Sequence, residues 1–334
     1  MPLWICLLTR IITKQDSGRI DNTFSFSDYS LREIMFMDLD YGKKKSNGGA
    51  IYFKTSNCIL EISLSWFMNC SSCKGGGVFF FANGKGKLLI NTCCSSNCKV
   101  VNGIGQFIYS YGECQISKTC IKESGIGLFP MCQGCIVVEE YNSYFNDINI
   151  SSNSMFANSA LSISSYFSAD SLSNIHFCQF SKNLGIKILS FWFISNVTID
   201  DCVFSNNTNL HYGMITNDFS SIHISRSIFI NNELGYSYLL YNNYPSCTIT
   251  VEFSWFSDLF NLINPTGMFK NHSFFHLKHI QNISPVYTCP LIEKIANPTS
   301  PIAMILILIV VNLILGCLAQ RNKDKEENIY GNLD

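Results

Sequence analysis

The sequence is poor in charged residues. Lys, Arg, Asp and Glu make up 14% of its 334 residues, whereas a typical soluble domain has roughly 25%. The formal net charge is −1, so the chain lacks the basic field that holds a nucleic acid. Ser, Asn and Thr replace the missing charges, and they suit turns and strand surfaces better than helix faces. The composition therefore favours an all-β protein that does not bind nucleic acid.

Motifs of several enzyme classes are also missing. The sequence contains no Gly-x-Ser-x-Gly nucleophile elbow and no glycine-rich phosphate loop, which excludes the enzymes built on those motifs. His272, His276 and His279 have the spacing of a helix face, but the Glu of a metalloprotease helix is absent. We therefore expect these histidines to lie in a strand or a stem, and they predict no metal site.

A long apolar run lies near the C-terminus. Residues 302–319 read IAMILILIVVNLILGCLA, with Asn312 as the single polar residue. As a helix this run would span about 27 Å, close to a hydrocarbon core of roughly 30 Å. Arg321, Lys323 and Lys325 follow it, and the preceding NPTSP carries no charge. By the positive-inside tendency, we predict a transmembrane helix with a cytoplasmic C-terminus and an external N-terminus in the plasma membrane.

The N-terminal residues 1–21 give a weak export signal. MPLWICLLTR has an apolar stretch followed by Arg10, but it lacks an early basic region and a small-residue cleavage site. Two interpretations stay open. Either the transmembrane segment itself directs insertion, or Met1 is not the native start.

One phrase of the sequence returns after 25 residues. SNVTIDDCVFSNNT at 195–208 and SSIHISRSIFINNE at 220–233 agree at alternating apolar positions, then at an aromatic residue, then at asparagines. The coinciding pairs are Val197 with Ile222, Ile199 with Ile224, Val203 with Ile228, Phe204 with Phe229, and Asn206-Asn207 with Asn231-Asn232. Further copies follow in both directions. Self-similarity at this period is typical of a solenoid.

Each repeat is built from short strands. Apolar residues at every second position mark a strand with one buried face, and the Asn, Ser and Gly clusters that follow mark turns. Ile, Val, Phe and Cys fill the positions where a leucine-rich repeat has Leu. The sequence therefore predicts a right-handed parallel β-helix, a pectin-lyase-like solenoid, over residues 22–286. Phe should stack on Phe and Asn on Asn in successive turns, with ladders of side-chain amides.

Recurring tetrapeptides stand in register with the repeat. FSKN at 180–183, FSNN at 204–207 and FINN at 229–232 have the form Phe-x-x-Asn, and GGAI stands at 48–51 with a variant GGGV at 75–78. Together they resemble the polymorphic outer-membrane protein repeats of chlamydiae and the similar surface proteins of parabasalid flagellates. The resemblance implies a β-helical domain displayed at the cell surface, often for adhesion. This chain ends in an apolar run instead of a β-barrel, which favours the single-pass eukaryotic form.

The predicted ectodomain is rich in cysteine. Because we expect it to lie outside the cytoplasm, we predict that some of the cysteines clustered between 58 and 135 form disulfides, whose connectivity the sequence does not give. Cys-x-x-Cys occurs at 70–73 and 132–135, but these pairs are too far apart for a zinc finger, so we predict no zinc site. Cys178 and Cys202 share one repeat position, where Cys commonly serves as a small buried apolar residue.

Short motifs predict modification and sorting. The tail contains Tyr330 and Leu333 in the Tyr-x-x-apolar form that cytoplasmic trafficking adaptors read. Asn-x-Ser/Thr sequons, the acceptors of N-glycans, occur before the apolar run at Asn69, Asn149, Asn196, Asn206, Asn271 and Asn282. Those at Asn69 and Asn206 fall in the expected turns, where a glycan has little room.

Parallel β-helices include polysaccharide-cleaving enzymes, so the acidic residues of the repeats were considered as catalytic groups. Asp200-Asp201 resembles one fragment of the polygalacturonase signatures, but strand alternation is expected to send the two side chains to opposite faces, which would prevent joint acid–base chemistry. Glu139-Glu140 is expected to form a solvated strand edge. Arg226 has no acidic cluster beside it in the sequence. We therefore predict no catalytic residue, no cofactor and no resident metal.

These observations combine into one prediction. Residues 22–286 form the β-helical ectodomain, 287–301 a stem, 302–319 the transmembrane helix, and 320–334 a cytoplasmic tail. The expected function is adhesion or surface recognition through an extracellular glycan or protein ligand. The alternative is a β-helical carbohydrate-active enzyme, a polysaccharide lyase or hydrolase.

Overall fold

The structure is a computed structural model. It describes residues 47–53, 59–101, 103–125, 134–155, 159–165, 171–235 and 238–257. Of Phe80 and residues 82–85 it describes the backbone alone, as it does for short strands at 11–12, 20–22, 29–32, 35–37, 40–41 and 268–271. The chain divides into two compact units, Met1–Thr288 and Cys289–Asp334, and all described residues belong to the first.

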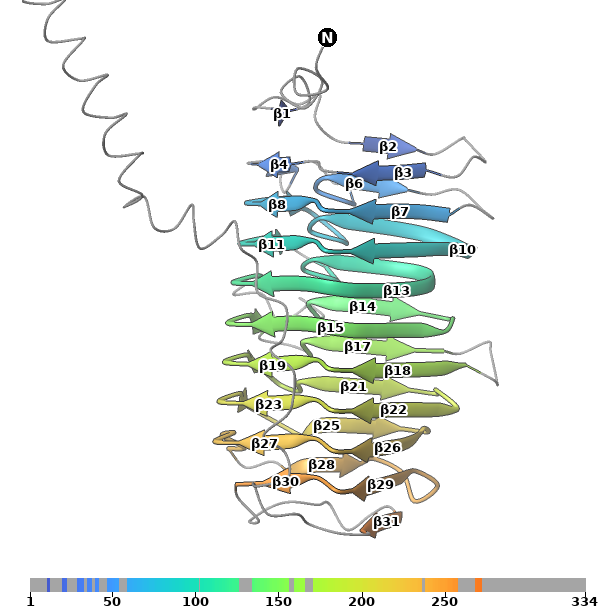
Figure 1. Ribbon diagram of the computed structural model, residues 1–334, viewed down its shortest axis with the longest axis vertical. Helices are drawn as coiled ribbons and strands as arrows, with labels where there is room; N and C mark the ends of the chain where they lie inside the picture. The colour runs from blue at the N-terminus through green and yellow to red at the C-terminus, as the bar shows by residue number, and fades with distance from the viewer. Residues whose placement is uncertain are drawn as a thin grey trace, which may run out of the picture. The chain divides into compact units, whose positions relative to one another are not determined.

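The described residues form a parallel β-solenoid whose strands stack in three columns (Figure 1). Column A contains β2 (Ile20–Asn22), β6 (Ile51–Phe53), the start of β10 (Phe79–Asn91), the start of β13 (Ile108–Lys122), β14 (Ile136–Glu139), β17 (Leu161–Ser164), β21 (Leu189–Trp192), β25 (Gly213–Asp218) and β28 (Tyr238–Asn242).

Column B follows column A along each turn of the chain. It contains β3 (Tyr29–Arg32), β7 (Ile59–Ser63), the end of β10, the middle of β13, the start of β15 (Ser143–Ser151), β18 (Leu172–His176), β22 (Asn196–Asp200), β26 (Ser221–Ser225), β29 (Thr248–Glu252) and β31 (Met268–Asn271).

Column C completes the turn. It contains β1 (Ile11–Ile12), β4 (Met35–Met37), β8 (Trp66–Met68), β11 (Cys94–Ser96), the ends of β13 and β15, β19 (Gln179–Ser181), β23 (Val203–Ser205), β27 (Ile228–Ile230) and β30 (Trp255–Phe256). Two small sheets are formed by strands that follow column C and precede the next strand of column A. One contains β5 (Asp40–Tyr41), β9 (Ser71–Ser72) and β12 (Lys99–Val100), and the other contains β16 (Ser154–Met155), β20 (Leu184–Gly185) and β24 (Thr208–Asn209).

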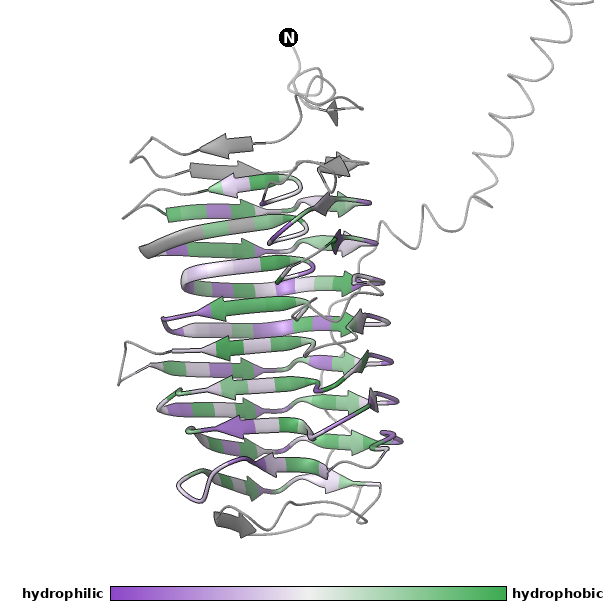
Figure 2. Ribbon diagram, turned by 180° about the vertical axis from the view of Figure 1, so that it is seen from behind, coloured by the Kyte–Doolittle hydropathy of each residue, from purple (hydrophilic) through white to green (hydrophobic). Residues whose placement is uncertain are grey.

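The repeat read from the sequence is the strand register of the solenoid. Val197 pairs with Ile222 and Ile199 with Ile224 between β22 and β26, and Phe204 pairs with Phe229 between β23 and β27. The predicted parallel β-helix is thereby confirmed for the described residues, which contain no helix. Hydrophobic and hydrophilic residues alternate along the stacked strands (Figure 2), since one face of each strand is buried.

Phenylalanines of column C stack inside the solenoid as the repeat predicts. Phe180, Phe204, Phe229 and Phe256 lie in four successive strands, with adjacent ring centroids 4.6–5.0 Å apart and interplanar angles of 10° or less. The rings of Phe180, Phe204 and Phe229 are almost completely buried. A single turn cannot bury its own apolar face, so this stack ties each turn to its neighbours.

An amide ladder runs beside the phenylalanine stack. Asn153 Nδ2 donates to Asn183 Oδ1 at 3.0 Å, Asn183 Nδ2 to Asn207 Oδ1 at 3.1 Å, and Asn207 Nδ2 to Asn232 Oδ1 at 3.0 Å. The predicted stacking of Asn on Asn is confirmed. Each amide also holds a backbone carbonyl, as Asn207 Nδ2 does with Phe180 O at 2.8 Å.

Left-handed residues turn the chain at the corners of each coil. Between columns B and C, Phe177, Asp201 and Arg226 have φ of 52°, 51° and 46°. Between columns A and B, Phe193 and Phe219 have φ of 56° and 61°. Non-glycine residues enter this region rarely, and the backbone holds them here through bonds between turns, such as Phe177 N to Asp200 O at 3.2 Å.

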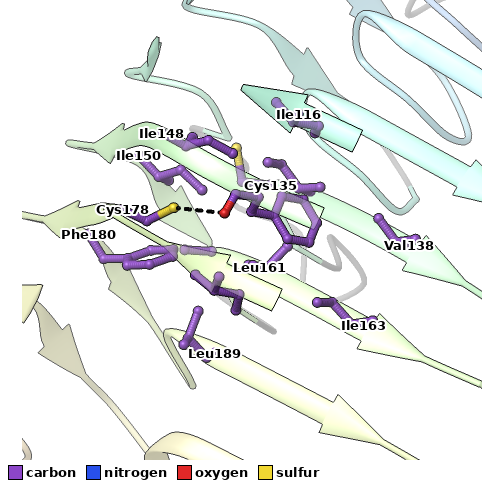
Figure 3. Packing of buried hydrophobic residues seen from close by; sticks show 14 of the residues in the cluster. Ile116, Cys135, Val138, Ile148, Ile150, Leu161, Ile163, Cys178, Phe180 and Leu189 are labelled. Carbon is purple, nitrogen blue, oxygen red and sulfur yellow. Dashed lines mark hydrogen bonds between the residues drawn. The ribbon is translucent and has the colours of Figure 1, made fainter. Parts of the chain in front are cut away.

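Cysteine replaces serine or threonine at one corner of the coil. Cys178 Sγ and Cys202 Sγ each donate to the carbonyl oxygen two residues earlier, both at 3.2 Å. Ser227 and Ser254 make the same bond with their hydroxyls at 2.8 and 2.9 Å. Figure 3 shows Cys178 among buried apolar residues, with its thiol directed at a second carbonyl, that of Phe145. The thiol at this position is therefore a buried hydrogen-bond donor.

Eight described cysteines carry free thiols, so the predicted disulfides find no support among them. They are Cys73, Cys93, Cys98, Cys114, Cys135, Cys178, Cys202 and Cys247. Most are buried, and burial raises the pKa of Cys93 to about 12. Because the thiolate is the reactive form, such a thiol is inert.

Several predictions fall on residues that the structure does not describe. The predicted stem at 287–301, span at 302–319 and tail at 320–334 lie outside the described residues, as do Asn282, Tyr330 and Leu333. Within the part of the chain that is described, no helix has the length and apolar character needed to cross a membrane.

Candidate functional site

Large aromatic side chains are exposed at the edge of column A. Phe193, Phe219 and Tyr244 follow β21, β25 and β28, and their side chains are about 40% exposed. The rings of Phe193 and Phe219 stack with centroids 4.7 Å apart, and those of Phe219 and Tyr244 with centroids 3.8 Å apart. Folding buries most of the described phenylalanine rings, so an exposed row of stacked rings marks a surface suited to binding.

A second group of rings lies next to this row, on the outer face of column A. Trp192 ends β21 and is 38% exposed, and Tyr212 precedes β25 and is 49% exposed. Lys187 Nζ lies 5.5 Å from the ring centroid of each. Contacts at this distance are cation–π interactions. We call Trp192, Phe193, Tyr212, Phe219 and Tyr244 the aromatic surface.

A buried carboxylate lies beside the aromatic surface. Asp218 is the register partner of Trp192 on the neighbouring strand, so both project from the outer face of column A. Its Oδ1 accepts a hydrogen bond from Asn243 Nδ2 at 2.6 Å. Its Oδ2 is buried and has no hydrogen-bond partner, although the residue is only 2% exposed. An unsatisfied buried carboxylate oxygen is costly, and native proteins have few of them.

The two charges of this site are shifted in opposite directions. Burial raises the pKa of Asp218, against the opposing effects of the Asn243 hydrogen bond and the Lys187 charge. Burial lowers the pKa of Lys187, against the attraction of Asp218. Both charged forms are thus disfavoured by the loss of water around them. Such paired shifts are common at functional sites.

Glu139 and Glu140 do not form a solvated strand edge, and that prediction was wrong. Glu139 ends β14 on the outer face of column A, where its Oε2 accepts a hydrogen bond from the Tyr109 hydroxyl at 2.7 Å. Burial raises the pKa of Glu139. Glu140 is 6% exposed and occupies a left-handed corner with φ of 81°. The corner folds its side chain against the coil, which strand alternation alone does not foresee.

The two carboxylates of Asp200-Asp201 converge, contrary to the prediction from strand alternation. His176 Nε2 lies 3.5 Å from Asp200 Oδ2 and 3.2 Å from Asp201 Oδ2. Asp200 ends β22, but Asp201 is left-handed with φ of 51°. This turn of the backbone ends the alternation, so both side chains reach the same corner of the coil.

Arg226 occupies the space between these two carboxylates. Its Nη2 donates to Asp201 Oδ2 at 3.0 Å and also to Asp200, and its Nε donates to Asp201 Oδ1 at 3.1 Å. The hydrogen bond to Asp201 makes the largest contribution to raising the pKa of Arg226. No acidic cluster was predicted beside Arg226, and that interpretation was wrong. Asp200 and Asp201 come from the preceding turn, so they are not adjacent to Arg226 in the sequence.

The same corner has the side chains of a metal site. Ligand atoms of His176, Asp200 and Asp201 lie within 4.8 Å of one another, and imidazole with carboxylates suits several divalent ions. The guanidinium of Arg226 already donates to both acids, so an ion would have to displace it. The described parts of the two Cys-x-x-Cys motifs are Cys70, Cys73 and Cys135, and they form no comparable group.

The described sequons differ in accessibility. Asn69, Asn196 and Asn206 are exposed, whereas Asn149 is 7% exposed and its Oδ1 has no hydrogen-bond partner. Asn69 Oδ1 accepts a hydrogen bond from Asn97 Nδ2 at 2.7 Å. The side chain of Asn271 is outside the described part of the structure. An acceptor asparagine must be exposed to carry a glycan, and Asn69, Asn196 and Asn206 meet that condition.

The residues of the aromatic surface were not predicted from the sequence. They lie in column A and at its ends, whereas the repeat was recognised from residues of columns B and C. A signal for them exists, because Phe193, Phe219 and Tyr244 stand 26 and 25 residues apart, in register with the repeat. Comparisons with known proteins found no matching family model, no similar curated protein and no similar solved structure.

Proposed function

We propose that this chain is a single-pass surface protein of the plasma membrane whose ectodomain acts in adhesion or surface recognition. The apolar run at 302–319 would anchor it, with the N-terminus outside and the tail 320–334 in the cytoplasm. The ectodomain would be the right-handed form of the solenoid, since parallel crossover connections are almost always right-handed. This is the membrane-anchored relative of the polymorphic outer-membrane proteins that the tetrapeptides suggest.

The aromatic surface carries the proposal of recognition. Phe193, Phe219 and Tyr244 present a continuous row of exposed rings, and Trp192 and Tyr212 extend it across column A. Aromatic side chains are enriched where proteins bind partners, because each contributes a large contact area at little cost in conformational entropy. A solenoid holds such residues in fixed positions on stacked strands.

Two further features belong to the same proposal. N-glycans at the exposed Asn69, Asn196 and Asn206 would fit an external ectodomain. Tyr330 and Leu333 in the tail would bind a cytoplasmic trafficking adaptor, which places them on the opposite side of the membrane.

A second candidate function is a carbohydrate-active enzyme. The observation in its favour is the pair of Asp218 and Lys187 beside exposed rings, with pKa values shifted toward each other by burial. General acid–base catalysis uses groups tuned in this way. The two described carboxylates that converge, those of Asp200 and Asp201, are both paired with Arg226, whereas a glycoside hydrolase keeps its carboxyl pair open to the substrate. Recognition is therefore the better supported function.

Antibody access to tags at the two ends tests the topology. An N-terminal tag should be stained on intact cells, and a C-terminal tag only after permeabilisation. Glycosidase treatment should reduce the apparent mass of the full chain if the exposed sequons carry N-glycans. An N-terminal tag that stays hidden until permeabilisation would refute surface display.

A further inference from the structure

We propose that the outer face of column A binds a neutral saccharide, with Trp192 as the stacking platform and Asp218 and Lys187 as its polar contacts. This inference rests on the proposed recognition function and names the chemistry of the ligand. The observation that carries it is Asp218 Oδ2, a buried carboxylate oxygen without a hydrogen-bond partner, on a residue that is the register partner of the exposed Trp192.

Asp218 requires a donor that the protein does not supply. Asn243 Nδ2 satisfies Oδ1 at 2.6 Å, while Oδ2 has no donor. The charge of Lys187 acts to lower the pKa of Asp218, but no ion pair within 4.0 Å joins these two described residues. A hydroxyl group donates one hydrogen bond, which is what Oδ2 lacks. Binding a hydroxyl there would remove an unsatisfied buried acceptor from the free protein.

Lys187, in turn, requires a hydrogen-bond acceptor from the ligand. Its ammonium has three donors and no acceptor, and it lies over the rings of Trp192 and Tyr212 instead of in contact with a carboxylate. Neighbouring hydroxyls of a sugar satisfy both demands, because one accepts from Lys187 while another donates to Asp218. A simple anion would be repelled by Asp218 and a simple cation by Lys187.

The rings supply the remaining contact. Trp192, at 38% exposure, and Tyr212, at 49%, present apolar surface next to both charges. Ligand sites typically combine aromatic lining with a few placed polar groups. A pyranose has the matching form, with an apolar C–H face that stacks on a ring and hydroxyls around its edge. This match selects a saccharide over a protein or a lipid.

A small rearrangement admits the ligand. Because Asp218 Oδ2 is buried, a hydroxyl reaches it only when a neighbouring side chain moves. Lys187 has four rotatable bonds, and its described interactions are the two ring contacts and the attraction of the Asp218 charge. Moving it breaks no described hydrogen bond, and its long stem lets the ammonium reach a second hydroxyl of the same sugar. Displacing Trp192 would instead break its bond from Nε1 to Ser190 Oγ.

Calorimetric titration of the full chain tests the site. The chain is held in lauryldimethylamine oxide micelles, because alkyl glycoside detergents carry a sugar. The neutral probes are cellohexaose, maltohexaose and N-acetylchitohexaose, and the charged probes are hexagalacturonate and a glucosamine hexamer. We expect at least one neutral hexasaccharide to bind, and both charged ones to bind at least tenfold more weakly than it.

Variants assign that binding to the three residues. Asp218→Asn keeps the shape but removes an acceptor, Lys187→Met keeps the stem but removes the donors, and Trp192→Ala removes the platform. Each should weaken binding at least tenfold, with an unchanged circular dichroism spectrum. Phe253→Asn is the matched control, because it removes a ring of 47% exposure from another corner where φ is 49°. Asn accepts that conformation, and binding should be unchanged.

The outcomes separate this inference from the proposed function. Absence of binding to every neutral probe, or equal binding by the four variants and the wild type, overturns the saccharide site even if the tags show surface display. Binding that the three site variants abolish supports the site even if the tags show an internal protein. A stronger response to hexagalacturonate or to the glucosamine hexamer also overturns it, because the Lys187 and Asp218 pair then does not select a neutral ligand.

Discussion

The side-chain amide of Asn183 donates a hydrogen bond to Oδ1 of Asn207, 3.1 Å away and one turn further along the solenoid. The backbone N–H of Asn183 donates to the same oxygen, also at 3.1 Å. One acceptor thus satisfies two buried donors of the preceding turn. The ladder joins the turns at the short step between two pairings, that of β19 with β23 and that of β20 with β24.

Removing one member of the ladder should destabilise the protein. Asn207→Ala removes the acceptor shared by the backbone N–H and one side-chain N–H of Asn183, and also the side-chain donor to the carbonyl of Phe180. Because each buried polar group left unsatisfied costs roughly 1–3 kcal/mol, we expect a loss of about 3 kcal/mol in the free energy of unfolding, measured by urea denaturation. The exposed Asn196→Ala is the control and should cost less than about 0.5 kcal/mol. Equal effects of the two variants would contradict the role of the ladder.

Serine should replace cysteine at the corner between columns B and C. Cys202 Sγ donates to Asp200 O at 3.2 Å, and Ser227 makes the equivalent bond one turn later. We expect Cys202→Ser to change the free energy of unfolding by less than about 1 kcal/mol. Cys202→Val removes the donor and should cost about 2 kcal/mol. Thermal unfolding of both variants with and without dithiothreitol checks this, and a loss of stability in Cys202→Ser that reductant reproduces in the wild type would refute it.

Arg226 should contribute little to stability in spite of its several contacts. Its side chain is 53% exposed, and exposed ion pairs are worth at most about 1 kcal/mol. We therefore expect Arg226→Ala to cost less than that in urea denaturation. The variant also frees Asp200 and Asp201, so we expect it to bind Zn²⁺ through them and His176, as measured by calorimetry. A second substitution, His176→Ala, should weaken this binding, and equal Zn²⁺ binding by the wild type would show that Arg226 does not block the corner.

Asp218 should make stability depend on pH. Burial raises its folded-state pKa above the ordinary value of 3.8, so the folded protein holds the proton more tightly than the unfolded chain. Stability is then greatest below 3.8 and falls as the pH rises through the folded-state pKa. We expect Asp218→Asn to raise the melting temperature relative to the wild type at pH 7, and to raise it less at pH 3.5.

The control for this pH dependence is Glu61→Gln, which removes an exposed carboxylate of β7. Differential scanning calorimetry of the three proteins at both pH values gives the comparison. A difference between Asp218→Asn and the wild type that is the same at both pH values would mean that the buried charge of Asp218 is not its source.

The register of the solenoid was predictable because the repeat and the strand period reinforce each other. Aligning Val197 with Ile222 and Phe204 with Phe229 needs only like residues at equal spacing. The ladder of Asn183 and Asn207 follows from the same alignment, since neighbouring turns lie about 4.8 Å apart and bring equivalent amides into contact.

The corners were not predictable from the residue types. Phe193, Asp201 and Arg226 have left-handed backbone, although only Asp is common there and none is glycine. Bonds between turns fix this conformation, and a single repeat does not contain them. The errors at Asp200-Asp201 and Glu139-Glu140 have this one cause. Asp218 was missed for another reason, because its partners come from other turns: Trp192 is its register partner in the previous turn and Asn243 donates to it from the next.

The interchange of cysteine and serine at Cys178, Cys202, Ser227 and Ser254 bears on how the cysteines of this coil are interpreted. Both kinds of side chain donate to the backbone carbonyl two residues earlier, so a thiol and a hydroxyl satisfy the same acceptor. Cys178 and Cys202 occupy one position of adjacent turns, and their thiols also interact with each other. Cysteine at this corner therefore acts as a hydrogen-bond donor inside the coil, and the number of cysteines in the sequence is not by itself a count of disulfides.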